Sequence, residues 1–151
     1  MEFNNGQLDF KKDIKTGEEG EAFIRSFQEN LGFTFIHSCK NISYDLKMSY
    51  KGQEYTYEIK TDTYARDTGN MVIEFECRGK ASGINATQAD YFTYFFPHLG
   101  EIWNIRCDRL RWLINETRPH IFENAGDQGS GTKLYRLKKN EVRDYFKVHK
   151  L

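Results

Sequence analysis

The chain has 151 residues, and its 22 lysines and arginines balance 22 aspartates and glutamates, so the formal net charge is zero. A chain of this length buries enough surface to fold without disulfides or a structural metal, and its three cysteines and four histidines lack the spacing of a zinc site. No apolar run approaches the ~20 residues of a membrane-spanning helix, and the N-terminal residues lack the apolar core of a signal peptide, so we expect an intracellular, cytoplasmic protein with no membrane contact.

A helix is predicted from Gly17 to Leu31, where apolar side chains recur with helical spacing. They form one stripe, made of Phe23, Ile24, Phe27 and Leu31. Thr16 is a suitable N-cap, and Glu19 occupies the position three residues later that completes a capping box. These signals predict where the helix begins and which face it buries.

Strands are predicted from short runs rich in aromatic and β-branched residues. In chain order they are 34–38, 43–50, 54–61, 71–77, 91–96, 101–106 and 132–137. Helices are predicted at 108–115 and 140–147, and a short helical or turn segment at 87–92. The strand at 101–106 is expected to return antiparallel to the one at 91–96. This order predicts an α/β fold in which helices flank a mixed β-sheet.

Lys51 and Gly52 mark the turn between two of these strands. A hairpin centred on this pair places Asp45 opposite Glu58, with Cβ atoms about 4.5–5.5 Å apart. Because side chains alternate along a strand, Lys60 lies on the same face as Glu58. The hairpin therefore predicts two carboxylates and a lysine side by side on one face of the sheet.

Two opposed carboxylates repel each other, and a divalent cation is the simplest reason to place them together. Mg²⁺ and Mn²⁺ prefer oxygen ligands, typically one or two carboxylates with water and substrate phosphate. We expect Asp45 and Glu58 to bind such an ion with the backbone carbonyl of Ile59. Lys60 would then hold or deprotonate an attacking water, or neutralise charge in the transition state. Hydrolysis of a phosphodiester needs these parts.

Several segments between residues 17 and 97 together form a recognisable pattern. They are Gly17-Glu-Glu-Gly-Glu21, Tyr44-Asp45, Glu58-Ile-Lys60, Gly69-Asn-Met-Val-Ile-Glu74, and Arg78-Gly-Lys80 ahead of Ser82-Gly83. The pattern resembles the PD-(D/E)xK nuclease superfamily, especially its small phage-encoded and Holliday-junction-resolvase-like members. Tyr44 stands where the family name has proline.

The resemblance implies a restriction-endonuclease-like core of αβββαβ order. It implies one nuclease domain over residues 1–151, with a core of about 17–106 and a basic C-terminal extension at 107–151. Asp45 and Glu58 would be metal ligands, Lys60 would be catalytic, and Glu21 would assist metal or water binding.

Two acids have alternative interpretations. Glu21 lies at the edge of the apolar stripe of its helix, where an ordinary ion pair with Arg25, four residues later, would also fit. Glu74 lies on the polar side of its strand and is either an additional acid near the metal or a solvated residue.

Contacts to nucleic acid are predicted in two loops. Arg78, Lys80 and Ser82 precede a Ser-Gly turn that suits a phosphate strand. Tyr64 and Arg66 would stack on nucleic acid or position it. For both groups an ordinary polar loop is the alternative.

Residues 101–151 carry 11 basic and 7 acidic side chains, a net charge of +4. Their basic side chains would hold flanking phosphates or form a solvated face; they are Arg106, Arg109, Arg111, Lys138, Lys139, Arg143, Lys147 and Lys150. Core packing, rather than a platform for base stacking, is predicted for Tyr91, Tyr94, Phe95, Phe96, Trp103 and Trp112.

We therefore expect a Mg²⁺- or Mn²⁺-dependent deoxyribonuclease, a phosphodiester hydrolase acting on DNA as an endonuclease. RNA stays open as a substrate, and a homodimer is expected where two strands are cut. The alternative is a catalytically inactive nucleic-acid-binding or interaction module on the same fold. Stabilisation by Mn²⁺ would separate the two hypotheses, because an intact carboxylate site binds the ion and a solvated face does not.

Overall fold

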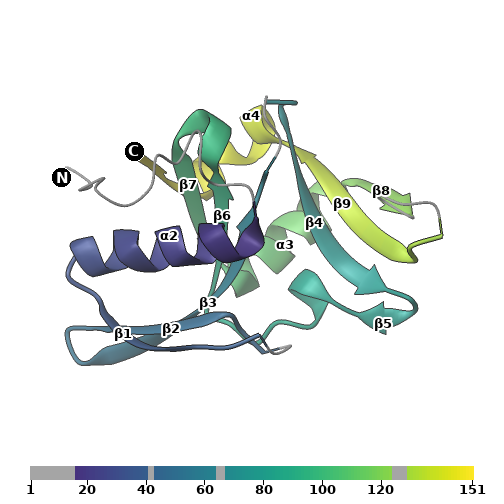
Figure 1. Ribbon diagram of the computed structural model, residues 1–151. Coiled ribbons are helices and arrows are strands. Elements are labelled where there is room, and N and C mark those ends of the chain that lie inside the picture. Colours follow the sequence, from purple (N-terminus) through teal and green to yellow (C-terminus); the bar gives the residue numbers. More distant parts are fainter. Residues whose placement is uncertain (1–15, 41–42, 64–66, 124–128) are drawn as a thin grey trace.

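The computed structural model describes residues 16–40, 43–63, 67–123 and 129–151 (Figure 1). Its helices are α2 (Gly17–Asn30), α3 (Cys107–Thr117) and α4 (Lys139–Val142), with 3₁₀ turns η1 (Gly83–Asn85), η2 (Pro97–Leu99) and η3 (Arg143–Tyr145). Its strands are β1 (Thr34–Ser38), β2 (Leu46–Tyr50), β3 (Gln53–Thr61), β4 (Asn70–Cys77), β5 (Lys80–Ala81), β6 (Tyr91–Phe96), β7 (Glu101–Arg106), β8 (His120–Glu123), β9 (Thr132–Lys138) and β10 (Lys147–Lys150). No helix within these ranges combines the length and the apolar character needed to cross a bilayer.

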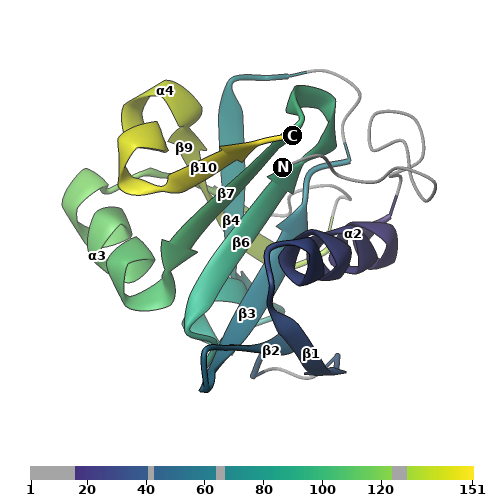
Figure 2. The ribbon, with the colours of Figure 1, turned by 90° about the vertical axis from the view of Figure 1, so that its left-hand side faces the viewer.

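The strands form two sheets. The larger has the order β1-β2-β3-β6-β7-β10 and is antiparallel except for the parallel pair of β3 and β6. The smaller has the order β5-β4-β9-β8 and is antiparallel throughout. Helix α2 packs on one face of the larger sheet, and α3 lies on the other side (Figure 2). The predicted mixed α/β class is confirmed.

Helix α2 begins where the sequence predicts. The hydroxyl of Thr16 accepts a hydrogen bond from the backbone N–H of Glu19 at 3.2 Å, which satisfies one of the free donors of the first turn. The side chains that it buries against the larger sheet are Phe23, Ile24 and Phe27. Leu31, which was expected in this stripe, is 38% exposed, because the helix ends at Asn30 and Leu31 forms its C-cap.

Buried apolar side chains form two clusters, one between α2 and the larger sheet and one between the two sheets and α3. Most of the aromatic residues predicted as core are fully buried, namely Tyr94, Phe95, Phe96 and Trp103. Tyr91 is half-buried. For Trp112 the prediction was wrong: the side chain is 42% exposed and lies 4.2 Å from the Arg109 guanidinium, because α3 buries its opposite face.

The connection between the parallel strands β3 and β6 differs from the αβββαβ order. Its described residues form β4, β5 and η1, and none of them is in an α-helix. Met71 and Ile73 are buried while their neighbours along β4 are not, and this period of two suits a strand. Because β4 pairs with β9, the chain passes through the smaller sheet before it enters β6.

Other element boundaries also differ from those predicted from the sequence. No helix is present at 87–90; the helical turn is η1, just before this segment. The helix predicted at 140–147 is interrupted, because α4 ends at Val142 and the last residues form β10 on the edge of β7. The predicted strand at 43–50 begins only at Leu46.

Candidate active site

The hairpin of β2 and β3 has the predicted register. Leu46 pairs with Tyr57, and the turn residues Lys51 and Gly52 have φ values of 50° and 79°. Two positive φ angles are typical of the tight turn that matches the twist of a hairpin. The regular ladder ends at Leu46, immediately before Asp45.

Beyond the end of the ladder, the side chain of Asp45 forms the next hydrogen bond to β3. Its Oδ2 accepts a hydrogen bond from the backbone N–H of Ile59 at 2.8 Å. The backbone N–H of Asp45 itself donates to the carbonyl of Tyr57 at 2.9 Å. The carboxylate thus replaces a backbone carbonyl as the partner of β3, and these bonds hold Asp45 beside Glu58.

Glu58 is held from a distant part of the chain. The Thr87 hydroxyl lies 2.9 Å from Glu58 Oε1 and 3.1 Å from the carbonyl of Ser43, and its single proton is donated to one of them at a time. Arg111 of α3 donates to the carbonyl of Thr87 at 2.9 Å and to that of Ile84 at 3.1 Å. Helix α3 therefore fixes the loop that positions Glu58.

Glu21, Asp45, Glu58 and Glu74 form what we call the carboxylate cluster. Burial raises the pKa of Glu58 to about 7, and the charges of the other three add to this shift, against the Thr87 hydrogen bond. Burial also raises the pKa of Asp45, although the Ile59 hydrogen bond and Lys40 oppose it. The pKa of Glu21 is raised by burial and by Asp45. The four acids come from α2, β3, β4 and the residue before β2, and the charges of the other three all act on Glu58.

The ordinary ion pair considered for Glu21 is not formed. Arg25 instead pairs with Glu29 at 3.3 Å and lies 3.4 Å above the Phe35 ring. Lys40 lowers the pKa of both Glu21 and Asp45, but it is exposed and bonded to Glu18. An exposed lysine compensates partly buried carboxylates poorly.

Lys60 is exposed on the same face of β3 as Glu58. It lines a cleft of about 260 Å³ together with Tyr94 and residues of β4 and the loop after β3. Within the described ranges its ammonium forms no salt bridge. The lysine is therefore available to a ligand in this cleft.

A metal ion at the cluster would have to bind through few protein ligands. Among the described residues, no three His, Cys, Asp or Glu side chains have the spacing of a ready-made metal site. The donors at hand are the carboxylate oxygens of Asp45 and Glu58 and the backbone carbonyl of Ile59. One or two carboxylates completed by water are what Mg²⁺ commonly uses, so this oxygen set fits a hard divalent cation.

Three of the residues predicted to contact nucleic acid lie within the described ranges. Arg78 is exposed in the turn between β4 and β5, and Lys80 is exposed as the first residue of β5, while Ser82 is half-buried and its hydroxyl has no partner among the described residues. Tyr64 and Arg66 lie outside the described residues.

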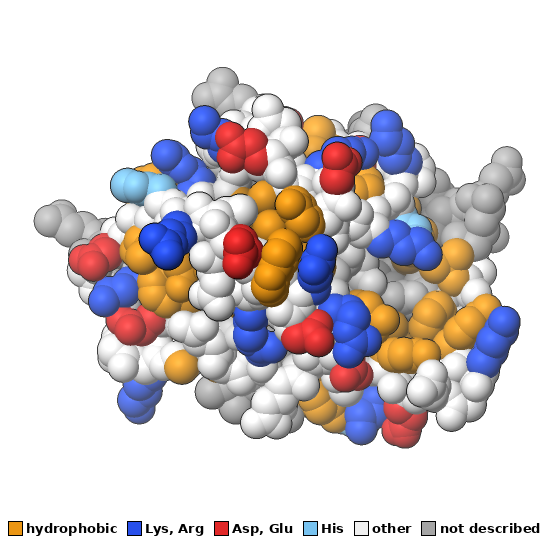
Figure 3. Space-filling model, turned by 180° about the vertical axis from the view of Figure 1, so that it is seen from behind, with side chains coloured by type: hydrophobic (Ala, Val, Ile, Leu, Met, Phe, Trp, Pro, Cys, Tyr) orange, Lys and Arg blue, Asp and Glu red, His pale blue; other side chains and the backbone are white. Residues whose placement is uncertain are grey.

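Some basic side chains of the C-terminal third form ion pairs and hydrogen bonds within the protein. Lys139 is 6% exposed and bonds Asp67 at 2.6 Å, and Arg143 forms two bonds to Glu101 at 3.0 and 3.2 Å. Arg111 likewise bonds within the protein, so part of this basic charge is already paired, and the role of these residues toward flanking phosphates stays a prediction. On the face shown in Figure 3, basic side chains alternate with acidic and apolar ones and form no continuous patch.

Replacing Glu58 with Gln is expected to stabilise the metal-free protein above pH 7 by about 1–3 kcal/mol, since one pKa unit corresponds to about 1.4 kcal/mol. A carboxylate whose pKa rises from 4.5 to about 7 on folding destabilises the folded state increasingly between these values. Below pH 4.5 the variant and the parent should be alike. Urea unfolding in EDTA at pH 4.5 and pH 8 measures this. Glu54→Gln, at an exposed position of the same strand, is the control, and equal effects of both substitutions would contradict the prediction.

Thr87 and Arg111 are the site residues that sequence reasoning missed. Thr87 is 29 residues from Glu58, and Arg111 is 24 residues from Thr87, so no local pattern marks them. The chain matches no protein-family model and no curated protein. Its candidate function therefore depends on the geometry of its own residues.

Proposed function

We propose that this protein is a Mg²⁺- or Mn²⁺-dependent nuclease that hydrolyses phosphodiester bonds of DNA, built on a variant of the restriction-endonuclease-like core. One observation carries the proposal: Glu58 is partly buried beside Asp45, its pKa is raised to about 7, and Lys60 follows on the same strand face. Burying carboxylates without a cation beside them destabilises a protein. Such groups therefore occur mainly at functional sites, where their shifted pKa values are used.

Asp45 and Glu58 would hold the cation, with the carbonyl of Ile59 beside them. A bound divalent cation polarises a phosphoryl oxygen and lowers the pKa of water. Asp45 is pre-positioned for this role by its bond to Ile59, and Glu58 by its bond to Thr87. Because each carboxylate has one oxygen engaged in this way, neither side chain has to be ordered when the ion binds.

Lys60 would orient the attacking water and stabilise the negative charge that develops on the phosphoryl oxygens. Its exposure in the cleft gives a phosphate direct access to the ammonium group. Glu21 would accept a hydrogen bond from water at the same site. Its charge contributes to the raised pKa of Glu58.

Mn²⁺ is expected to raise the melting temperature of the protein at pH 8 by several degrees at 100 times its Kd, because binding at that excess stabilises the folded state by about 2.7 kcal/mol. Asp45→Asn should remove most of this shift. A matched substitution, Glu29→Gln, replaces an exposed acid of α2 outside the cluster and should retain it. The same stabilisation in parent and Asp45→Asn protein would contradict a site at the cluster.

Cleavage is tested directly with plasmid, linear, single-stranded and four-way-junction DNA, and with RNA, in Mg²⁺ or Mn²⁺. The proposal predicts metal-dependent cutting of at least one DNA substrate. Stabilisation by Mn²⁺ without cleavage of any substrate would instead favour a binding module on the same scaffold.

A further inference from the structure

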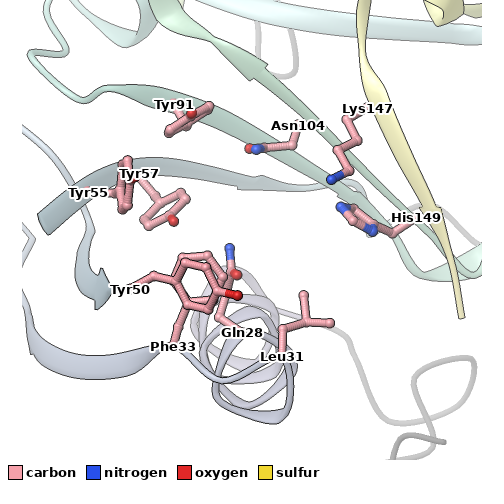
Figure 4. A pocket seen from close by; sticks show the side chains of 10 residues that line it. All are labelled: Gln28, Leu31, Phe33, Tyr50, Tyr55, Tyr57, Tyr91, Asn104, Lys147 and His149. Carbon is pink, nitrogen blue, oxygen red and sulfur yellow. The ribbon is translucent and has the colours of Figure 1, made fainter. Parts of the chain in front are cut away.

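A second cavity lies on the opposite face of the larger sheet from Glu58. It has a volume of about 300 Å³, at the lower end of the roughly 300–1,000 Å³ typical of ligand pockets. Its side chains converge from α2, β2, β3, β6, β7 and β10 (Figure 4). Because Tyr57 and Glu58 are neighbours on β3, they point to opposite faces, and this tyrosine pocket is separate from the carboxylate cluster.

Two stacked aromatic pairs form the walls of the tyrosine pocket. The rings of Tyr57 and Tyr91 lie 5.7 Å apart at 22°, and those of Phe33 and Tyr50 lie 4.6 Å apart at 23°. Tyr55 lies between the pairs, 6.1 Å from Tyr91 and 6.4 Å from Phe33. Rings that come from separate elements and leave a cavity between them suit a flat aromatic ligand, because each offers a π-face or an edge.

The amides of the pocket are suited to recognising the edge of such a ring. Asn104 Oδ1 accepts a hydrogen bond from the Thr93 hydroxyl at 2.7 Å, which orients its NH₂ group and leaves it as a donor. Gln28, at the end of α2, brings a second amide toward the same space (Figure 4). Donors and acceptors side by side are what hydrogen bonding to a nucleobase requires.

The charges around the pocket select the sign of the ligand. Lys147 lines it, and the Arg106 guanidinium, which also pairs with Asp108 at 3.4 Å, lies outside the lining, 5.7 Å from the Tyr91 ring centre. His149 also lines it, and burial together with Lys147 lowers the pKa of this imidazole. Of the described residues, no Asp or Glu lines the cavity. Because Lys147 is a cation and no described carboxylate offsets it in the lining, the pocket favours an anionic ligand over a cationic one.

We propose that the tyrosine pocket binds a nucleotide, with the base between the tyrosine rings and the phosphate on Lys147 and Arg106. The nucleotide is either free or an unpaired residue of a single strand, since the same base and phosphate are presented in both. This binding needs no metal and no cleavage, so it goes beyond the proposed nuclease activity.

Calorimetric titration in EDTA tests the proposal with dAMP, deoxyadenosine, ribose 5-phosphate and a short single-stranded oligodeoxynucleotide. We expect dAMP to bind more tightly than either of its halves. Tyr91→Ala should weaken dAMP binding roughly tenfold or more, as loss of a base-stacking ring does, whereas Tyr91→Phe should retain it. Unfolding curves of both variants establish that they are folded.

Lys147→Ala should weaken dAMP binding severalfold and leave deoxyadenosine binding unchanged. Lys150→Ala, on the same edge strand but with its side chain on the other face, is the matched control. Tighter binding of the oligonucleotide than of dAMP assigns the pocket to a strand, and the reverse assigns it to the free nucleotide. Absence of binding by every probe, or equal binding by Tyr91→Ala protein, overturns the proposal. The dAMP titration contains neither a metal ion nor a phosphodiester bond, which keeps this result independent of the nuclease proposal.

Discussion

Lys60→Ala is expected to reduce metal-dependent DNA cleavage by about 100-fold or more, the usual effect of removing a group that stabilises transition-state charge. Glu58→Ala should have a comparable effect, because it removes a proposed metal ligand. Lys60 is exposed and forms no salt bridge with a described residue, so its removal should change the free energy of unfolding by less than about 0.5 kcal/mol. Loss of cleavage would then report chemistry rather than unfolding.

The measurement is the initial rate of cleavage of the best DNA substrate in Mn²⁺, with urea unfolding of each variant. Lys150→Ala serves as the charge-matched control, because this exposed lysine lies on β10, at the opposite edge of the larger sheet from β1. It should cleave at the parental rate. Parental rates in both Lys60→Ala and Glu58→Ala proteins would refute the assignment of the active site.

Gly20→Ala is expected to destabilise the protein by about 1–3 kcal/mol, although alanine is the better helix former by about 1 kcal/mol. A Cβ atom at Gly20 would lie 1.9 Å from Thr61 Oγ1 and 2.8 Å from Thr61 Cβ. Helix α2 would have to move away from β3 to relieve this overlap. The displacement would also shift Glu21, so cleavage should fall along with stability.

Gly17→Ala is the matched control within the same helix, because nothing lies within 4 Å of the added Cβ. It should leave stability unchanged or raise it by a few tenths of a kcal/mol. Thr61→Ala removes the closest clashing atom, so the double variant with Gly20→Ala should be less destabilised than the sum of the single variants. Additive effects in urea unfolding, or equal effects of Gly17→Ala and Gly20→Ala, would contradict the close approach of helix and strand.

The parts of the fold that depend on neighbours in the chain follow from the sequence. The N-cap at Thr16, the strand at 34–38 and the hairpin around Lys51 and Gly52 are observed as predicted. In each of them the signals lie within a few residues of one another. The proximity of Asp45 to Glu58 belongs to this class, because the turn alone sets which residues face each other.

Longer-range features were misjudged or missed. The segment at 140–147 has helical spacing, yet its end is drawn into an edge strand by pairing with β7, which outweighs local propensity. The connection from β3 to β6 was expected to contain a helix and instead joins a second sheet. Such pairings join residues far apart along the chain, so no short pattern contains them.

The sequence by itself predicted Asp45, Glu58 and Lys60 as neighbours on one face, because they lie on one hairpin whose geometry is local. Only the tertiary structure decided how those groups are held and what surrounds them. Thr87 reaches Glu58, Arg111 secures Thr87, and tyrosines of different strands enclose a cavity on the far side of the sheet. The contacts form, and the cavity remains, because packing brings together segments that are far apart along the chain. That packing depends on the whole chain rather than on any short segment.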